Sequence, residues 1–261
     1  MAQYASVFNA VEGNTTFYAL QPPARIRQWC EEAPAHLRFC FKFHQNISHK
    51  LRLSGAEAAT REFFALLAPF GERLGPFFLQ LHDSFGPKEL PVLAAYLKAL
   101  PRDYNYIVEV RHEAFFDGGL NERAVDDLLG GLGVERVNFD TTGLFASTGG
   151  GQHVQKSLDR KPPVPFRATA LGKSPVVRFV GDPVVEKNCL ALEAWAGRFA
   201  GWIAEGRQPW FFAHHPDDTY APDIARIFQR KLHELCPTVS APAVWPSEKE
   251  AAAGGEQLGL F

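Results

Sequence analysis

Short apolar runs rich in aromatic and β-branched residues alternate along the chain with longer segments whose apolar residues recur at helical spacing. This alternation is typical of βα units around a parallel sheet. Strands are predicted at 10–17, 38–44, 77–82, 104–111, 136–140, 176–180 and 209–214. Helices are predicted at 54–70, 87–100, 121–132, 184–204 and 222–235.

Repeated βα units over this length favour an α/β fold of the TIM (β/α) barrel type over an open sheet, because no glycine-rich dinucleotide-binding turn follows any strand. Ser54 and Glu57 have the spacing of a capping box at the start of the first predicted helix. A connection at 141–175, with a Gly-Gly-Gly run and a Pro-Pro-Val-Pro run, is too long for a simple loop and is expected to be functional or disordered.

The composition at the end of the chain changes to Ala, Pro, Glu and Gly. The predicted organisation is therefore one barrel domain at 1–240 and a flexible tail at 241–261.

Charge and cysteine usage narrow the functional classes. The formal net charge is −2, so the whole molecule has no general attraction for nucleic acid or membranes. The four cysteines lie far apart, which is typical of reduced thiols and not of a zinc or redox motif. No apolar run reaches the roughly 20 residues that span a bilayer. We therefore expect a cytoplasmic protein without a membrane partner.

Side chains two positions apart share a face of a strand, and in a βα barrel one face points into the barrel or toward its mouth. This rule groups polar residues at the ends of the predicted strands. The groups are Glu12 with Asn14, Cys40 with Lys42 and His44, Gln80 with His82, Glu109 with Arg111, and Asn138 with Asp140, and Arg178 and His214 stand on the last two strands. Polar residues clustered at a barrel mouth predict a functional site.

Lys42, Arg111 and Arg178 are three positive charges in this set and imply an anionic ligand. The connection before the sixth strand adds a basic segment, because 152–178 contains six Lys and Arg residues and one Asp. We expect this segment to fold over the mouth. The alternatives are a solvated loop without a partner, and a salt-bridge network in which Lys42 and the arginines are neutralised by Glu12 and Glu109.

Catalytic roles are assigned to four residues: Glu109 or Asp140 as general base, Lys42 as acid and anion holder, and Arg111 as the group that orients Glu109. The predicted ligand-binding residues are Glu12, Asn14, His44, His49, Gln80, Arg178 and His214. His44 is a second candidate acid. A multi-zinc nuclease site is the alternative, but no H-x-H or H-x-x-x-H pair is present and the cations would repel a metal. No metal and no cofactor are predicted.

Several ordered motifs make the chain similar to a known family. They are the run 8–17 (Phe-Asn-Ala-Val-Glu-Gly-Asn-Thr-Thr-Phe) with Tyr18, the run 39–43 (Phe-Cys-Phe-Lys-Phe) with Ile47-Ser48-His49, Leu79-Gln80-Leu81, the run 108–112 (Val-Glu-Val-Arg-His), and Arg178-Phe179. From Tyr4 to about Leu235 the chain resembles the YecE-like family, the domain of unknown function 72.

The resemblance implies a TIM barrel without a known activity, and its recurrent polar positions map onto Glu12, Asn14, Lys42, His49, Gln80, Glu109, Arg111, Asp140 and Arg178. Members usually begin with a further strand before the position of Tyr4, so a barrel lacking its usual first strand is expected here. Either the start was assigned too late, or seven strands leave an exposed edge. His214 and His215 stand where many members carry asparagines.

The last residues, Gln257-Leu258-Gly259-Leu260-Phe261, follow a run of small residues. The pattern Q-L-x-L-F is similar to the bacterial sliding-clamp binding motif, in which the glutamine and the last apolar pair enter a pocket of the clamp. Gln257, Leu258, Leu260 and Phe261 are therefore predicted to bind the clamp, which would raise the local concentration at DNA without a basic surface. The alternative is a tail that packs on its own domain or has no role.

These observations predict a protein that binds or processes a phosphate-bearing ligand, either nucleic acid or a nucleotide fragment, at the barrel mouth. Phosphodiesterase or nuclease chemistry in DNA repair is one enzymatic reading. A sugar-phosphate isomerase or lyase is a second enzymatic reading. A binding or adaptor module without catalysis is the third.

Overall fold

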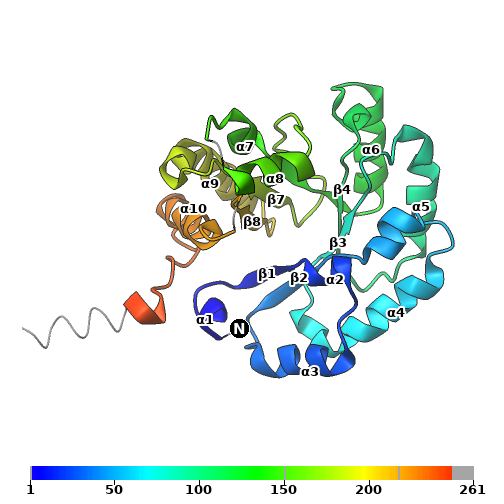
Figure 1. Ribbon diagram of the computed structural model, residues 1–261, viewed down its shortest axis with the longest axis horizontal. Coiled ribbons are helices and arrows are strands. Elements are labelled where there is room, and N and C mark those ends of the chain that lie inside the picture. The colour runs from blue at the N-terminus through cyan, green and yellow to red at the C-terminus, as the bar shows by residue number, and fades with distance from the viewer. Residues whose placement is uncertain (1, 150, 217, 249–261) are drawn as a thin grey trace, which may run out of the picture.

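Short parallel strands and intervening helices make up the computed structural model of the protein, which describes residues 2–149, 151–216 and 218–248 (Figure 1). The strands are β1 (Ala10–Gly13), β2 (Arg38–Phe41), β3 (Phe77–Gln80), β4 (Tyr106–Glu109), β5 (Glu135–Arg136), β6 (Asn138–Asp140), β7 (Val176–Val180) and β8 (Trp210–His214). The fold is therefore of the α/β class.

The strands are neighbours in chain order. β1 pairs with β2, β3 with β4 and β4 with β5, and β6 pairs with β7 and β7 with β8, all in parallel. Two isolated bridges, Phe39 to Leu74 and Lys42 to Phe78, join β2 to the segment of β3. The strands thus form three parallel sheets, β1-β2, β3-β4-β5 and β6-β7-β8. Within the described residues no backbone bond joins β8 to β1, so no closed barrel is found.

The two faces of the sheet carry different side chains. One face packs on the helices through large apolar clusters that include Phe41, Leu79 and Phe179. The other face, here called the inner face, carries Cys40, Phe78, Ile107 and Phe139, which form a separate cluster. Because residues of β1, β4 and β7 touch across the inner face, the sheet is strongly curved, with the helices outside it (Figure 1).

The α-helices of the described residues are α1 (Ala2–Ala5), α2 (Thr15–Tyr18), α3 (Pro23–Glu32), α4 (Glu57–Leu67), α5 (Leu90–Ala99), α6 (Leu120–Gly131), α7 (Thr142–Ala146), α8 (Gln152–Arg160), α9 (Cys189–Ala204) and α10 (Ala221–Leu235). Of these, α4, α5, α6, α9 and α10 lie where periodicity predicts helices, and the others were not predicted. Short 3-10 helices lie at Ala68–Arg73, Pro87–Glu89, Glu113–Phe116 and Val185–Asn188, and a π-helical turn lies at Asn46–Lys50.

Several local predictions need correction. The first strand ends at Gly13 and not at Phe17, because the chain turns there into α2 and the Thr16 hydroxyl donates to the Lys42 carbonyl oxygen. The capping box at Ser54 does not form, since α4 begins after Ala56 and no side chain caps it. The connection 141–175, expected to be functional or disordered, holds the two helices α7 and α8.

The end of the described chain packs against the domain. Trp245 lies edge-on to Phe8 with ring centroids 5.7 Å apart, and Glu248 accepts two hydrogen bonds from Arg226 on α10. The segment predicted as a flexible tail from residue 241 is thus docked as far as Glu248. No helix of the described residues is long and apolar enough to cross a membrane.

Candidate functional site

A group of charged side chains lies at the carboxyl ends of the strands, on the inner face of the sheet. Here we call it the ionic cluster, and it consists of Glu12, Lys42, Gln80, Glu109, Arg111, Arg178 and His214. β1, β3, β4, β7 and β8 each carry one member, while Lys42 directly follows β2 and Arg111 lies two residues after the end of β4. All seven are predicted site residues, and the structure brings them together.

Arg178 is the centre of the cluster. Its Nε and Nη2 donate to the two carboxylate oxygens of Glu12 at 2.9 and 3.0 Å, and its Nη1 donates to Glu109 at 2.7 Å. The guanidinium lies over the rings of Phe78 and Phe139, each with its centroid 5.2 Å away. A buried arginine can satisfy this geometry because its planar fork donates in several fixed directions.

Arg111 and Lys42 share the side-chain oxygen of Gln80. Arg111 Nη2 donates to Gln80 Oε1 at 3.1 Å and Lys42 Nζ donates to the same atom at 2.9 Å. Arg111 also donates from Nε to Glu109 Oε1 at 2.7 Å. Gln80 therefore holds two cationic groups next to each other without neutralising either.

The two carboxylates of the cluster are ionised. Burial alone would raise the pKa of Glu109, but Arg178, Arg111 and Lys42 lower it to about 2. Burial acts on Glu12 in the same way, and Arg178 with His214 holds the pKa of Glu12 well below its ordinary value. Burial and Arg178 lower the pKa of His214. At neutral pH this ring is therefore neutral and donates from Nε2 to Glu12 at 3.1 Å.

Lys42 is the member of the cluster whose charge changes near neutral pH. Its side chain is almost completely buried, with Nζ 4.6 Å from the ring centroid of Phe78 and 5.4 Å from that of Phe17. Burial, and then the charge of Arg178, lower the pKa of Lys42 to about 8, against the opposing charges of Glu12 and Glu109. A lysine in this state can hold an anion and can also give up a proton.

The basic connection returns to the cluster, as the sequence predicts. Arg111 Nη1 donates to the carbonyl oxygen of Arg160, the last residue of α8, at 3.4 Å. The next residue, Lys161, donates to the Ser157 hydroxyl at 2.9 Å, and burial followed by the charge of Arg178 lowers its pKa. In the sequence Lys161 is one of six basic residues at 152–178, and spacing alone does not show which of them faces the mouth.

His49 lies at the rim of the same region. Its ring packs edge-on against Phe17 and His82, with centroids 5.0 and 5.2 Å away. Burial, then His82, Arg111 and Lys42, lower the pKa of His49 to about 4. His49 is therefore neutral at physiological pH, and its low pKa reflects burial first and the positive surroundings second.

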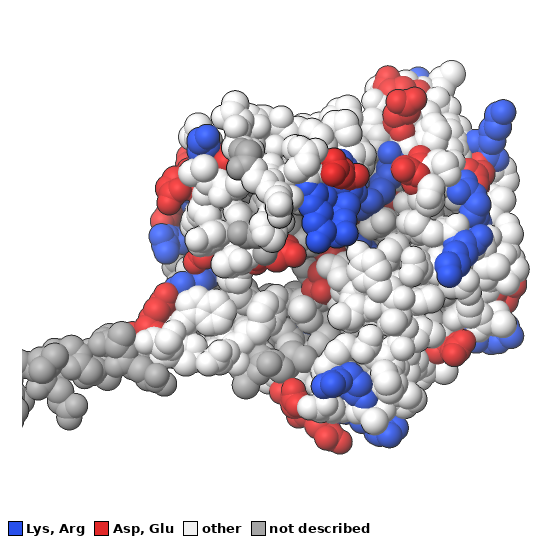
Figure 2. All heavy atoms as spheres, in the orientation of Figure 1, with Lys and Arg blue, Asp and Glu red and all other residues white. Residues whose placement is uncertain are grey.

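Cations outnumber the carboxylates of this site. Lys42, Arg111, Arg178 and Lys161 face Glu12 and Glu109, and Asp218 is a further carboxylate whose charge reaches Lys161. A cavity of about 730 Å³ opens beside Arg111 and is lined by Ser84, His112 and the prolines 162, 163 and 165 among others. Figure 2 shows Lys and Arg side chains gathered next to the central hollow of the face in view.

Two of the predicted residues outside the cluster, Asp140 and His44, make contacts elsewhere. Asp140 points to the helix-covered face, where Oδ1 accepts from Thr142 and Oδ2 accepts from the indole of Trp195 at 2.8 Å. The inner-face residue of β6 is Phe139, which lies opposite Arg178. His44 accepts a hydrogen bond from the Asn46 amide, a local contact within its own turn.

Asn14 occupies an intermediate position. It directly follows the last residue of β1, and it lines a second cavity together with Glu12 and His214. The predicted clamp-binding residues Gln257, Leu258, Leu260 and Phe261 lie outside the described residues.

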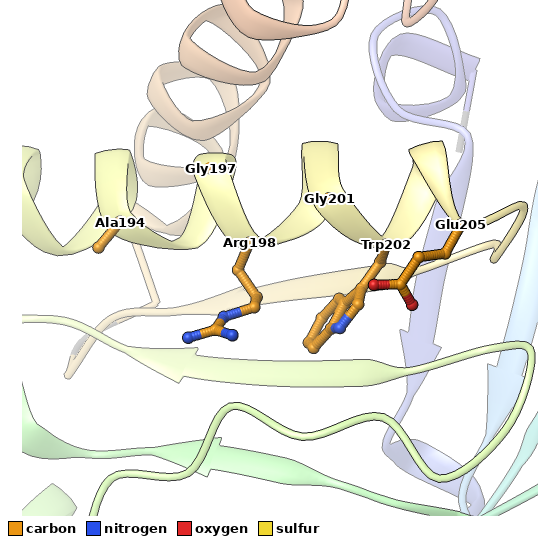
Figure 3. Close-up of a pocket in the computed structure, with 6 residues that line it drawn as sticks. All are labelled: Ala194, Gly197, Arg198, Gly201, Trp202 and Glu205. Carbon is orange, nitrogen blue, oxygen red and sulfur yellow. The ribbon is translucent and has the colours of Figure 1, made fainter.

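A shallow hollow on α9 contains none of these groups (Figure 3). Ala194, Gly197, Arg198, Gly201 and Trp202 of α9 line it, together with Glu205, the residue that follows this helix. Small residues on a helix surface leave such a depression without creating a site. Across the described residues, no group of three or more His, Cys, Asp and Glu side chains is placed to hold a metal ion.

Residues 1–249 match the family model described as a protein of unknown function, DUF72. The UPF0759 protein YecE of Escherichia coli (strain K12) is 35% identical over 248 residues, which cover 95% of this chain and 91% of YecE. This chain belongs to the DUF72 family. The YecE protein of E. coli O157:H7 is 34% identical over the same length.

Solved structures of DUF72 proteins have the same fold. A DUF72 family protein from Enterococcus faecalis V583 has a TM-score of 0.66 and 16% identity, with 92% of this chain and 90% of that chain covered. A DUF72 family protein from Thermotoga maritima MSB8 has a TM-score of 0.57 and 16% identity, with 84% of each chain covered. At this identity, the likeness concerns the DUF72 fold alone.

Proposed function

We propose that this DUF72 protein binds a phosphate-bearing small molecule at the mouth of its curved sheet, with Arg111 and Lys161 as the first contacts and Lys42 behind them. The observation that carries the proposal is the excess of cations over the carboxylates within the site. Arg178 takes up most of the charge of Glu12 and shares Glu109 with Arg111, so the positive charge of Arg111 and Lys161 is only partly balanced at the mouth.

The geometry favours an anion over a neutral ligand. Cations that repel one another in a partly buried region are stabilised by an incoming negative group, and a tetrahedral oxyanion can accept from a guanidinium and an ammonium at once. Arg111 and the residue before Lys161 are already in contact, at 3.4 Å between Nη1 and the Arg160 carbonyl oxygen. The charge of Arg111 also acts on Lys161 and lowers its pKa, so we propose that one phosphoryl group contacts both cations.

The same geometry supports binding better than catalysis by the predicted general bases. Both oxygens of Glu109 accept from arginines and its pKa is about 2, which makes it a weak base. Asp140 is occupied by Thr142 and Trp195 on the other face. If a proton is transferred at this site, Lys42 with its pKa of about 8 is the suitable group.

Calorimetric titration tests this proposal with four probes: inorganic sulfate, inorganic phosphate, a sugar phosphate and a short single-stranded oligonucleotide. Lys161→Met removes one cation of the mouth, and we expect about tenfold weaker binding, the loss of one charge-assisted contact. Lys156→Met is the matched control, because Lys156 is exposed on helix α8, which ends at the residue before Lys161. Binding should then change less than about twofold.

Two outcomes would contradict the proposal: no binding of any anion by the unchanged protein, or equal effects of the Lys161 and Lys156 substitutions. The probe that binds with the highest affinity distinguishes the small-molecule hypothesis from the nucleic-acid hypothesis. A preference for the sugar phosphate supports a small-molecule site of the isomerase or lyase kind, whereas a preference for the oligonucleotide supports the nucleic-acid reading.

Three further parts of the interpretation belong to the same proposal. The curved parallel sheet is proposed to be a TIM-type (β/α) barrel opened between β8 and β1. The cytoplasm is the proposed location, supported by four free cysteines among the described residues. The last five residues are proposed to recruit the protein to the sliding clamp, as their sequence pattern predicts.

A further inference from the structure

Lys42 is the only lysine in the described part of the chain that is buried, with 5% of its surface exposed. It directly follows β2 and belongs to the ionic cluster. The rings of Phe78 and Phe17 lie against it, with centroids 4.6 and 5.4 Å from Nζ. A primary amine in such desolvated surroundings is suited to nucleophilic attack on a carbonyl group.

The amine of Lys42 is not saturated by its neighbours. Nζ donates to the neutral amide oxygen of Gln80 at 2.9 Å, whereas Glu12 Oε1 lies 3.8 Å away, beyond hydrogen-bond distance. The oxygens of Glu12 accept instead from Arg178 and His214. Because an ammonium group has three protons to donate, a purely structural role would leave most of the donor capacity of Lys42 unused.

The charges around Lys42 favour a free amine. Burial, and then the charge of Arg178, lower its pKa to about 8, so part of the Lys42 population is neutral near physiological pH. The neutral amine is the form that attacks a carbonyl carbon. The charges of Glu12 and Glu109 oppose this shift of the pKa, so they also stabilise a positive nitrogen that forms later at the same place.

Arg111 lies next to this amine. Its Nη2 and the Lys42 Nζ bond the same oxygen of Gln80, at 3.1 and 2.9 Å, so the two nitrogens are no more than about 6 Å apart. The Arg111 side chain is 16% exposed against 6% for Lys42, and Arg111 lines the cavity of about 730 Å³. A ligand that enters from this cavity therefore meets the guanidinium first and the amine behind it.

We propose that Lys42 forms a Schiff base with the carbonyl carbon of a short phosphorylated aldehyde or ketone whose phosphate is held by Arg111. This role of Lys42 rests on the phosphate site proposed above and gives that site a substrate class. A carbonyl one or two carbons from the phosphoester oxygen fits the distance between the two nitrogens, because three or four bonds of about 1.5 Å reach about 4–5 Å. A carbonyl at the end of a long chain would have to fold back to reach Lys42.

The step balances without an oxidant or a reductant. The Nζ lone pair forms a bond to the carbonyl carbon, and the carbonyl oxygen leaves as water with both amine protons. The imine then takes up a proton from solvent, and the resulting cation keeps a positive charge beside Glu12 and Glu109. The rings of Phe17 and Phe78 keep water away from it and slow its hydrolysis. Such a cation withdraws electrons from the adjacent carbon, which supports lyase or isomerase chemistry.

Reductive trapping on the full chain tests this role. Dihydroxyacetone phosphate is added with sodium cyanoborohydride, which reduces an imine to a stable secondary amine, and peptide mass spectrometry identifies the labelled lysines. We expect at least about tenfold more label on Lys42 than on the exposed Lys156. Lys156→Met is the matched control and should leave the label on Lys42 unchanged, whereas Lys42→Arg should remove the adduct. Glycerol phosphate, which carries a phosphate without a carbonyl, should compete with the labelling.

Calorimetric titration of dihydroxyacetone phosphate, run in parallel, separates this role from the phosphate site itself. Binding without label on Lys42 would overturn the Schiff base and leave the phosphate site standing. Label on Lys161 in preference to Lys42 would overturn the assignment of the nucleophile. Equal label from dihydroxyacetone, which lacks the phosphate, would overturn the substrate class. Absence of both binding and label would contradict the phosphate site as well.

Discussion

Arg178 is the residue on which the ionic cluster depends. It is the direct partner of both buried carboxylates, with three hydrogen bonds of 3.0 Å or less. We predict that Arg178→Met lowers the free energy of unfolding by about 3–5 kcal/mol, because Glu12 and Glu109 would then be buried with too few partners. Urea unfolding followed by circular dichroism measures this change.

A surface ion pair provides the comparison. Lys231 and Glu193 lie 2.9 Å apart, but the Glu193 side chain is 64% exposed. Lys231→Met should therefore cost less than about 1 kcal/mol. Adding Glu12→Gln and Glu109→Gln to Arg178→Met should recover part of the loss. If Arg178→Met costs no more than Lys231→Met, the cluster does not stabilise the fold in this way.

Lys42 gives the proposed site a pH dependence. Its pKa of about 8 means that the ammonium is charged below this pH and loses its proton as the pH rises through it. We predict that sulfate affinity falls severalfold between pH 7 and pH 9, since sulfate itself keeps its charge there. Titration calorimetry across this range measures the effect.

The variant Lys42→Arg separates this residue from the others. Arginine stays protonated in proteins, so the step near pH 8 should disappear. A step of unchanged size in Lys42→Arg would assign the titration to another group, for example Lys161, and would contradict the role given to Lys42.

At the level of secondary structure, β6 shows why the sequence predicted one face wrongly. Asn138, Phe139 and Asp140 alternate polar and apolar, and this pattern alone does not say which face is inside. The polar pair faces the helices because Trp195 and Thr142 bond to Asp140, and the Thr169 amide and carbonyl bond to Asn138. Buried polar groups that find partners can occupy a helix-covered face.

The position of Asp140 leads to a prediction that separates stability from binding. Asp140→Ala leaves the Trp195 indole without its acceptor, so the free energy of unfolding should fall by about 1–3 kcal/mol. Sulfate affinity should stay within about twofold of the unchanged protein, because the residue faces away from the cluster. Thermal unfolding and calorimetry measure the two effects. Loss of binding at unchanged stability would restore Asp140 as a site residue.

Other elements differ in how well their pattern predicts them. β7 was predicted at 176–180 with both ends right, since an apolar run with one buried arginine is bounded by Pro175 and Gly181. α3 was missed, because only Ile26 of its ten residues is buried and no apolar stripe marks it. The helices α7 and α8 were missed because they have only five and nine residues and lie next to Gly and Pro runs, which are typical of loops.

At the level of the whole molecule, strand parity predicted most residues of the candidate site. It did not predict which cations pair with which carboxylates. Parity placed Glu12, Lys42, Gln80, Glu109 and Arg111 on one face. Parity could not show that Arg178 would donate hydrogen bonds to both Glu12 and Glu109, because this depends on how strongly the sheet curves. The same curvature decides which lysine of the basic connection reaches the mouth.

The tail leads to a prediction for the molecule as a whole. Deleting 257–261 should abolish binding to a bacterial sliding clamp, whereas deleting 251–255 removes the same number of residues and keeps the motif. Surface plasmon resonance with immobilised clamp measures both affinities. If the two deletions behave alike, the clamp motif has no role.

The span of the Glu12–Arg178 pair affects how the protein is made. The two residues are 166 positions apart in the chain. At the usual rate of synthesis, Glu12 leaves the ribosome about 10–30 s before Arg178 does. During this interval a carboxylate destined for the interior has no guanidinium to meet, so the N-terminal strands cannot bury it early without a penalty. The sheet can therefore fold completely only after β7 has been translated. Chains that are released before that point should fail to fold.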